Sequence, residues 1–181
     1  MSVKKVTIAL CYDFDGTLSP GNMQEYAYIP KLGIKPKVFW DKVQRTARKY
    51  QADEILTYMN LMIQEAQGKV PIRKNDFIKY GEKARLYKGV ATWFTRINKY
   101  GAKQGVKVEH YIISSGIKEM IQGTRIARYF KKIFASSFIF NLNGVADWPG
   151  WAINFTTKTQ FLFRINKGYL DEWDNKKINK F

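Results

Sequence analysis

The sequence contains very little cysteine and histidine, because Cys11 and His110 are the only residues of each kind. A single cysteine cannot form a disulfide within the chain, and one Cys with one His does not make a zinc site. Cys11 falls inside a predicted strand, where we expect a buried and unreactive thiol. His110 lies among apolar residues and no G-x-S-x-G motif is present, so a serine-hydrolase triad is disfavoured.

Acidic residues are also scarce relative to basic ones. Fifteen Asp and Glu stand against 31 Lys and Arg, which gives a formal net charge of +16. This charge would allow binding to nucleic acid or another anionic surface. The lysines are spread along the chain without a dense arginine block, so we favour a solvated basic surface that also attracts phosphorylated substrates. A nucleic-acid-binding module remains an alternative, and steep salt dependence would identify it.

Long apolar segments are absent as well. No apolar run approaches the roughly 20 residues that a membrane-spanning helix needs. The N-terminal MSVKK leads straight into a predicted strand without a signal-peptide pattern, so we expect a cytoplasmic protein. A hydrophobic content of 45% in 181 residues suffices for one domain, or for a small core with an inserted subdomain.

Two carboxylates follow the first apolar run. Residues 6–12 are rich in β-branched and aromatic side chains and predict a fully buried strand, which ends at Asp13, Phe14 and Asp15. Because side chains alternate along a strand, Asp13 and Asp15 should point the same way. Carboxyl ends of strands in open α/β sheets are ligand-binding places, and paired carboxylates can share Mg2+.

The next part of the chain has helical periodicity. Apolar residues recur at helical spacing over residues 37–50, after Asp53, and from about 75 to 86. Proline and glycine separate these segments, and no strand is predicted between Ser19 and Lys88. We therefore expect an all-helical insertion after the first strand.

Two further strands and a late helix complete the pattern. Residues 106–113 predict a second strand that ends in a turn of Ser114, Ser115 and Gly116, which would suit a phosphate group. Residues 133–141 predict a third strand, followed by an Asn-Gly hairpin turn. A helix is predicted from Lys158, where a lysine is electrostatically unfavourable unless an anion lies near it.

The order of these motifs resembles the haloacid dehalogenase (HAD) superfamily, which consists mostly of phosphatases. The residues that carry the resemblance are DFDGT at 13–17, the Ser114 of YIISSG and the Lys158 of TTKTQ. The helical insertion looks like the small cap of the branch that contains phosphoserine phosphatase. The resemblance implies a three-layer α/β Rossmann-like fold with a parallel sheet, in which residues 1–20 and 88–181 form the core and 21–87 the cap.

The resemblance also implies a role for each motif residue. Asp13 would be the nucleophile that forms an aspartyl-phosphate, and Asp15 the general acid and base. Ser114, or its neighbour Ser115, would bind the phosphoryl group together with Gly116 and Lys158. Mg2+ would bind the Asp13 carboxylate and the Asp15 backbone carbonyl. The acid at position 15 favours phosphate ester hydrolysis over dehalogenation.

The C-terminal part departs from the family pattern. The family's fourth motif, an acidic cluster after an apolar strand, is not found, because Asp171, Glu172 and Asp174 follow a helix and are expected to be solvated. The chain thus resembles the front part of a longer phosphatase. We expect it to lack the C-terminal strands of that phosphatase's sheet. We expect weak or no turnover, an exposed first strand and self-association through it. A catalytically inactive binding fragment is a further alternative.

The sequence says little about the substrate. We expect a small phosphomonoester, such as a phospho-amino acid or a nucleoside monophosphate. The cap offers four arginines that could contact it, although solvent exposure is the simpler interpretation for each: Arg45, Arg48, Arg73 and Arg85.

Overall fold

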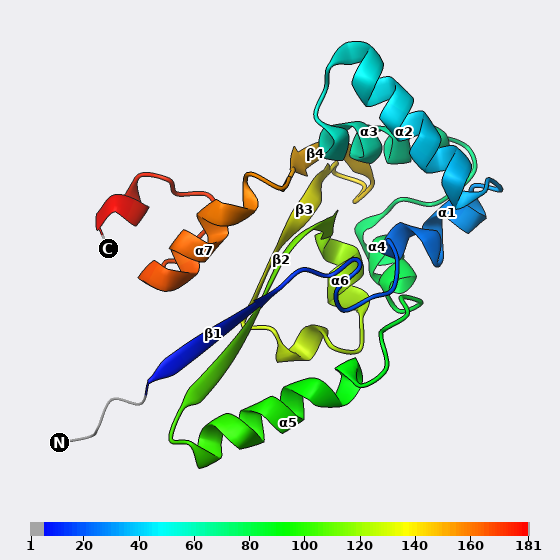
Figure 1. The fold of residues 1–181 in the computed structure, drawn as a ribbon. Coiled ribbons are helices and arrows are strands. Elements are labelled where there is room, and N and C mark those ends of the chain that lie inside the picture. Colours follow the sequence, from blue (N-terminus) through cyan, green and yellow to red (C-terminus); the bar gives the residue numbers. More distant parts are fainter. Residues whose placement is uncertain (1–5, 181) are drawn as a thin grey trace.

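The computed structural model describes residues 6–180 and is built around a mixed sheet (Figure 1). Within these residues the sheet has four strands in the order β1-β2-β3-β4. Their bounds are β1 (Thr7–Tyr12), β2 (Lys107–Ile117), β3 (Lys132–Phe140) and β4 (Ala146–Trp151). The pairs β1–β2 and β2–β3 are parallel, whereas β4 is antiparallel to β3, as the Asn143-Gly144 turn predicts.

The helices fall where the apolar periodicity places them. They are α1 (Tyr28–Lys31), α2 (Pro36–Tyr50), α3 (Glu54–Ala66), α4 (Lys74–Gly81), α5 (Val90–Lys103), α6 (Lys118–Gly123) and α7 (Lys158–Lys167), with short 3-10 turns η1 (Met23–Glu25), η2 (Ala127–Tyr129) and η3 (Lys177–Lys180). Residues 20–87 hold helices and no strand, as predicted. Between residues 6 and 180, every helix is too short or too polar to cross a membrane.

Helices cover both faces of the sheet and give the predicted three layers. Alternate residues of β2 point to opposite faces, so Ile112 joins the large core with α5 and α6, whereas Tyr111 and Ile113 join a smaller core with Phe161 of α7. This arrangement is an α/β Rossmann-like fold. The carboxyl ends of all three parallel strands therefore meet below the helical segment.

The first strand is less buried than the sequence suggests. β1 is an edge strand in the described sheet, Ile8 is 45% exposed, and Cys11 is exposed rather than buried. The prediction of a fully buried strand and an interior thiol was wrong. Its apolar run is typical of an interior strand, but α5 contacts β1 at Tyr12, through Trp93 and Phe94, while Ile8 and Cys11 stay exposed. The expected exposure of this strand's edge is confirmed.

Two glycines bring α4 and α6 into backbone contact. A Cβ added at Gly81 would lie 1.8 Å from the Met120 carbonyl oxygen, and one at Gly123 would lie 1.9 Å from that of Ile78. Such distances leave no space for any side chain. The contact fixes the helical segment against the helix that follows β2.

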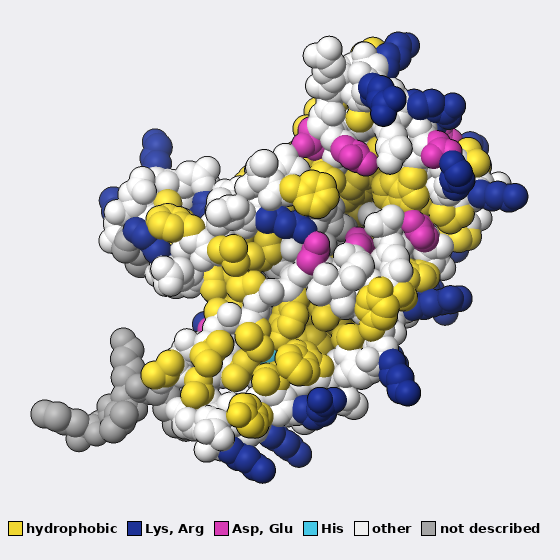
Figure 2. All heavy atoms as spheres, in the orientation of Figure 1, with side chains coloured by type: hydrophobic (Ala, Val, Ile, Leu, Met, Phe, Trp, Pro, Cys, Tyr) yellow, Lys and Arg dark blue, Asp and Glu magenta, His cyan; other side chains and the backbone are white. Residues whose placement is uncertain are grey.

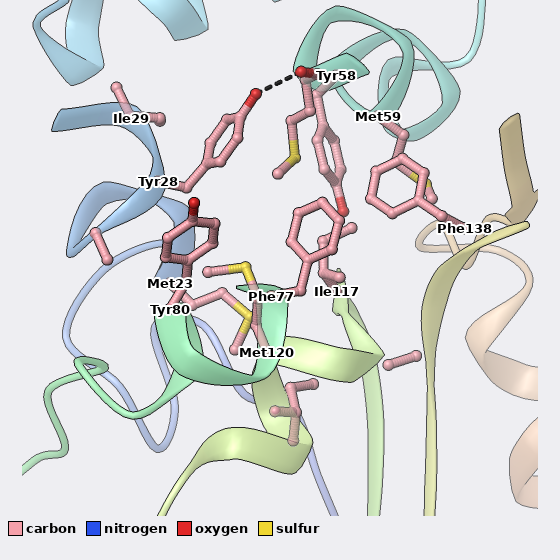
Figure 3. Close-up of a cluster of buried hydrophobic side chains, with 14 of the residues drawn as sticks. Met23, Tyr28, Ile29, Tyr58, Met59, Phe77, Tyr80, Ile117, Met120 and Phe138 are labelled. Carbon is pink, nitrogen blue, oxygen red and sulfur yellow. Dashed lines mark hydrogen bonds between the residues drawn. The ribbon is translucent and has the colours of Figure 1, made fainter. Parts of the chain in front are cut away.

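The helical segment shares its core with the sheet. Its two ends meet where the Tyr87 N–H donates to the Leu18 carbonyl at 3.0 Å. Side chains from α1, α3 and α4 pack with Ile117 of β2 and Phe138 of β3 in one apolar cluster (Figure 3). The Tyr28 hydroxyl closes its upper side by donating to the Met62 carbonyl. The segment is thus held by continuous packing.

The acidic cluster near the C-terminus is partly buried, contrary to the prediction of a solvated one. Glu172 is 7% exposed and its Oε1 lies 3.0 Å from the ammonium groups of both Lys118 and Lys132. A carboxylate can be buried here because two cations compensate it. Glu172 therefore anchors the C-terminal segment to the sheet.

The helix contact gives a stability prediction. Gly81→Ala should lower the free energy of unfolding by about 1–3 kcal/mol, because a methyl group must push two backbones apart. Gly21→Ala is the matched control, since its Cβ would meet only the end of the Tyr26 side chain at 3.2 Å. Denaturant unfolding of both variants measures the difference, and equal losses would contradict the close contact.

The free edge of β1 gives a second prediction, since self-association through it is untested. Ile8→Lys should reduce association at high concentration while leaving the circular dichroism spectrum unchanged, because Ile8 is exposed on the edge strand. Val38→Lys makes the same change at an exposed residue of α2 and should not reduce association. Analytical ultracentrifugation tests this, and a wild-type chain that stays monomeric would overturn the prediction.

Candidate active site

The chain turns sharply after β1 and points two carboxylates into a cavity. Gly16 has φ of +75°, and the N–H groups of Leu18 and Ser19 both donate to the Phe14 carbonyl. Phe14 is fully buried in the core, whereas Asp13 and Asp15 line the cavity, as the alternation predicts. The turn therefore fixes both acids on one side of the backbone.

The structure brings all six predicted site residues together. Asp13, Asp15, Ser114, Ser115, Gly116 and Lys158 line one cavity of about 580 Å³ between the strand ends and the helical segment. Lys158 is the first residue of α7, and its Nζ lies 2.6 Å from Asp13 Oδ2. An anionic partner thus accounts for a lysine at a helix start.

Asp15 is electrostatically different from Asp13. Burial is the main cause that raises the pKa of Asp15 to about 7. The Met23 N–H, which donates to Asp15 Oδ1 at 3.0 Å, opposes the shift, and the nearby Asp13 carboxylate adds to it. A carboxyl group with this pKa can hold a proton near neutral pH and release it during a reaction. The site therefore contains two different carboxyl groups. Asp15 can act as an acid, whereas Asp13 is a carboxylate paired with Lys158.

The serine segment is a bulge in the strand, and the predicted turn after the strand was wrong. β2 continues to Ile117, and its register with β3 shifts between Ser114 and Ile117. The bulge leaves Ser115 and Gly116 out of the ladder and turns them toward Asp15. A Cβ at Gly116 would lie 2.9 Å from Asp15 Oδ2, so only glycine fits there.

The two serines have different surroundings. Ser114 is fully buried, and its Oγ accepts a hydrogen bond from the Gly116 N–H at 3.0 Å, which leaves its own O–H free to donate. Ser115 Oγ is buried without a hydrogen-bond partner, and the Ser115 carbonyl accepts from the Tyr58 hydroxyl at 2.5 Å. Both hydroxyls can therefore donate to a ligand in the cavity.

The helical segment supplies residues that the sequence prediction missed. Trp40, Gln44, Asp53, Glu54 and Tyr58 line the cavity, whereas none of the four candidate arginines does. Asp53 is the N-cap of α3, and its Oδ1 accepts from the Leu56 N–H at 2.9 Å. Its Oδ2 accepts from Asn154 Nδ2 at 2.9 Å, which ties α3 to the loop before α7.

The donor set was tested for its fit to Mg2+. Within residues 6–180, no group of three or more His, Cys, Asp or Glu side chains could hold a metal ion. Mg2+ is commonly held by one or two carboxylates with several waters and substrate phosphate, and Asp13 and Asp15 meet that minimum. Neither Asp147 nor Asp171 lines the cavity. The residues therefore fit Mg2+ as a weak site.

Sequence comparison does not assign the chain to a family. No family model matches the chain. An uncharacterized protein of Borreliella burgdorferi is 29% identical over 193 aligned positions, which cover 93% of this chain and 67% of that protein.

Solved structures give the same fold at low identity. A HAD family hydrolase from Salmonella enterica serovar Typhi has a TM-score of 0.61 and 18% identity, over 91% of this chain and 52% of the hydrolase. Substrate-bound phosphoserine phosphatase has a TM-score of 0.60 and 15% identity, over 92% of this chain and 72% of the phosphatase. The chain thus spans about half the length of the Salmonella hydrolase, and it has a HAD-like fold.

The raised pKa of Asp15 predicts how stability changes with pH in metal-free buffer. The folded state holds the Asp15 proton more tightly than the unfolded state, so stability is lost as pH rises from about 4 to about 7. Asp15→Asn should therefore stabilise the protein at pH 8, by up to about 4 kcal/mol, and much less at pH 4.

Urea unfolding in the presence of a chelator measures this difference. Asp41→Asn is the matched control, because Asp41 is an exposed partner of Lys37 and should give no comparable pH-dependent gain. A gain from Asp15→Asn that is the same at both pH values would contradict the assigned environment.

Proposed function

We propose that this chain is a Mg2+-dependent phosphomonoester hydrolase that acts through an aspartyl-phosphate on Asp13. The observation that carries the proposal is the juxtaposition of three groups in one cavity: the Asp13 carboxylate, the Lys158 ammonium 2.6 Å from it, and Asp15 with a pKa of about 7. The HAD-like fold of hydrolases and phosphoserine phosphatase supports it.

In the first half of the reaction, an Asp13 oxygen attacks phosphorus. The bond between Asp13 and phosphorus forms while the ester P–O bond breaks, and Asp15 donates its proton to the departing oxygen. Lys158 and the serine hydroxyls compensate the charge on the phosphoryl oxygens. When Mg2+ is bound by the Asp13 carboxylate and the Asp15 backbone carbonyl, it supplies further neutralisation of this charge.

In the second half, Asp15 acts as a base. Its carboxylate takes a proton from a water molecule, whose oxygen attacks phosphorus and breaks the bond to Asp13. Phosphate leaves, and both carboxyl groups return to their starting protonation states.

We further propose that residues 21–87 act as a cap on a core formed by residues 1–20 and 88–181. The hydrogen bond between Tyr87 and Leu18 closes the base of the segment, and α2 and α3 form the cavity wall opposite the strand ends. In this family such a cap would select the part of the substrate that leaves. A cytoplasmic location stays an expectation from the sequence.

The alternatives receive less support from the structure. Nucleic-acid binding explains the net charge, but not a cavity with an acid of raised pKa and an ion-paired carboxylate. An inactive binding fragment would keep the cavity without Mg2+-dependent turnover. These alternatives are outcomes of the following test.

We expect weak but Mg2+-dependent hydrolysis of p-nitrophenyl phosphate, because one carboxylate and one backbone carbonyl would hold Mg2+ loosely. Asp13→Asn should abolish it by removing the nucleophile, whereas Asp41→Asn, an exposed Asp on α2, should not. Release of p-nitrophenol measures both. Activity unaffected by Asp13→Asn would refute the proposal. Strong activity that Asp13→Asn abolishes would show that a further acid completes the site.

A further inference from the structure

The cavity wall opposite the catalytic pair is rich in hydrogen-bond acceptors. Asp53 and Glu54 stand there at the N-terminus of α3. The residues around the cavity all lie within the described part of the chain, and Lys158 is their single cation. Because Lys158 is paired with Asp13, no cation of the cavity lining is left to pair with Asp53 or Glu54. Asp53 accepts hydrogen bonds from the Leu56 N–H and from Asn154 Nδ2.

Gln24 adds a buried acceptor that has no partner. It is 2% exposed, lines the same cavity, and its Oε1 makes no hydrogen bond. The orientation of its amide follows from its neighbour Tyr58. The Tyr58 hydroxyl already donates its hydrogen to the Ser115 carbonyl. Toward Gln24 this hydroxyl therefore acts as an acceptor, and the amide NH2 is the donor. The Gln24 carbonyl oxygen is therefore left to accept a hydrogen bond from a ligand.

An aromatic side chain completes this wall. The indole N–H of Trp40 donates to Glu25 Oε1 at 2.7 Å, which fixes the ring, and the ring centroid lies 5.8 Å from that of Tyr58. Asn22 Nδ2 donates a hydrogen bond to the same Glu25 oxygen at 2.9 Å. A fixed aromatic face beside carboxylates is a favourable surface for an organic cation.

We propose, building on the phosphatase function above, that the substrate is the phosphate monoester of an amino alcohol, with an ammonium group and no carboxylate on its leaving part. The phosphoryl group lies at Asp13 and Lys158, and the ammonium group donates to Gln24 Oε1, Asp53 and Glu54. These acceptors explain why a lysine or arginine is not needed on the cap side. A leaving group with a carboxylate would meet like charge at α3.

Binding to the full chain carrying Asp13→Asn tests this preference without turnover. Calorimetry with Mg2+ would compare inorganic phosphate, phosphoethanolamine, glycerol 3-phosphate and 3-phosphoglycerate. We expect phosphoethanolamine to bind about tenfold more tightly than glycerol 3-phosphate, because hydrogen bonds to charged groups replace neutral ones. We expect 3-phosphoglycerate to bind most weakly of the three esters.

A second variant tests whether the preference for phosphoethanolamine comes from the N-terminus of α3. Glu54→Gln, added to Asp13→Asn, should reduce the preference for phosphoethanolamine over glycerol 3-phosphate about fivefold, since it removes one carboxylate with little change in shape. Glu82→Gln is the matched control, because Glu82 is exposed at the end of α4 and away from the cavity, and it should leave the preference unchanged.

The outcomes separate this inference from the proposed function. If every ester fails to bind to the variant and inorganic phosphate also fails to bind to the unmodified chain with Mg2+, the phosphatase function fails and the inference fails with it. If phosphate binds but the three esters bind equally, or 3-phosphoglycerate binds best, only the amino-alcohol inference is overturned. A preference that Glu54→Gln and Glu82→Gln reduce equally would also overturn it.

Discussion

The position of the helical segment depends on the backbone contact between α4 and α6. Gly81 and Gly123 allow these helices to approach so closely that carbonyl groups occupy the space of side chains. α6 directly follows β2, and the contact thereby ties residues 74–81 to the strand that carries the serine bulge. The aromatic core above this contact, including Phe77 and Tyr80, then sets the height of α3 over the strand ends (Figure 3). Small residues at one crossing thus define the dimensions of the cavity.

The same packing gives the two acids their different properties. Phe14 is pulled into the core between them, so the backbone holds Asp13 at the cavity mouth and Asp15 deeper inside. Burial is the largest cause of the raised pKa of Asp15, and Gly116 packs against this carboxyl group without a side chain of its own. The ability of Asp15 to act as an acid therefore follows mainly from its burial, which the path of the backbone determines.

Local patterns predicted most of the fold, whereas the predictions that failed depended on tertiary surroundings. Strand order, the helical insertion, the paired aspartates and Lys158 follow from periodicity and motif order. The edge position of β1 was predicted from the missing fourth motif, but the exposure of Ile8 and Cys11 could not be predicted from the apolar run, because such a run looks the same in an edge strand and in a central one. The cap side of the cavity was also missed, since Asp53 and Glu54 look like an ordinary helix start and the orientation of α3 is set by distant packing. The burial of Glu172 depends likewise on two lysines from other elements.

The surface charge and the charges in the cavity act at different stages of substrate binding. Lys and Arg side chains project from much of the surface in view, whereas Asp and Glu gather around the hollow below α2 and α3 (Figure 2). The long-range field of a chain with net charge +16 acts on any anion during diffusion, and salt screens it over about 8 Å. Contacts inside the cavity act only after arrival and are screened far less. Ionic strength would therefore govern how often phosphorylated molecules reach the entrance, while the ranking of those retained would be nearly independent of it.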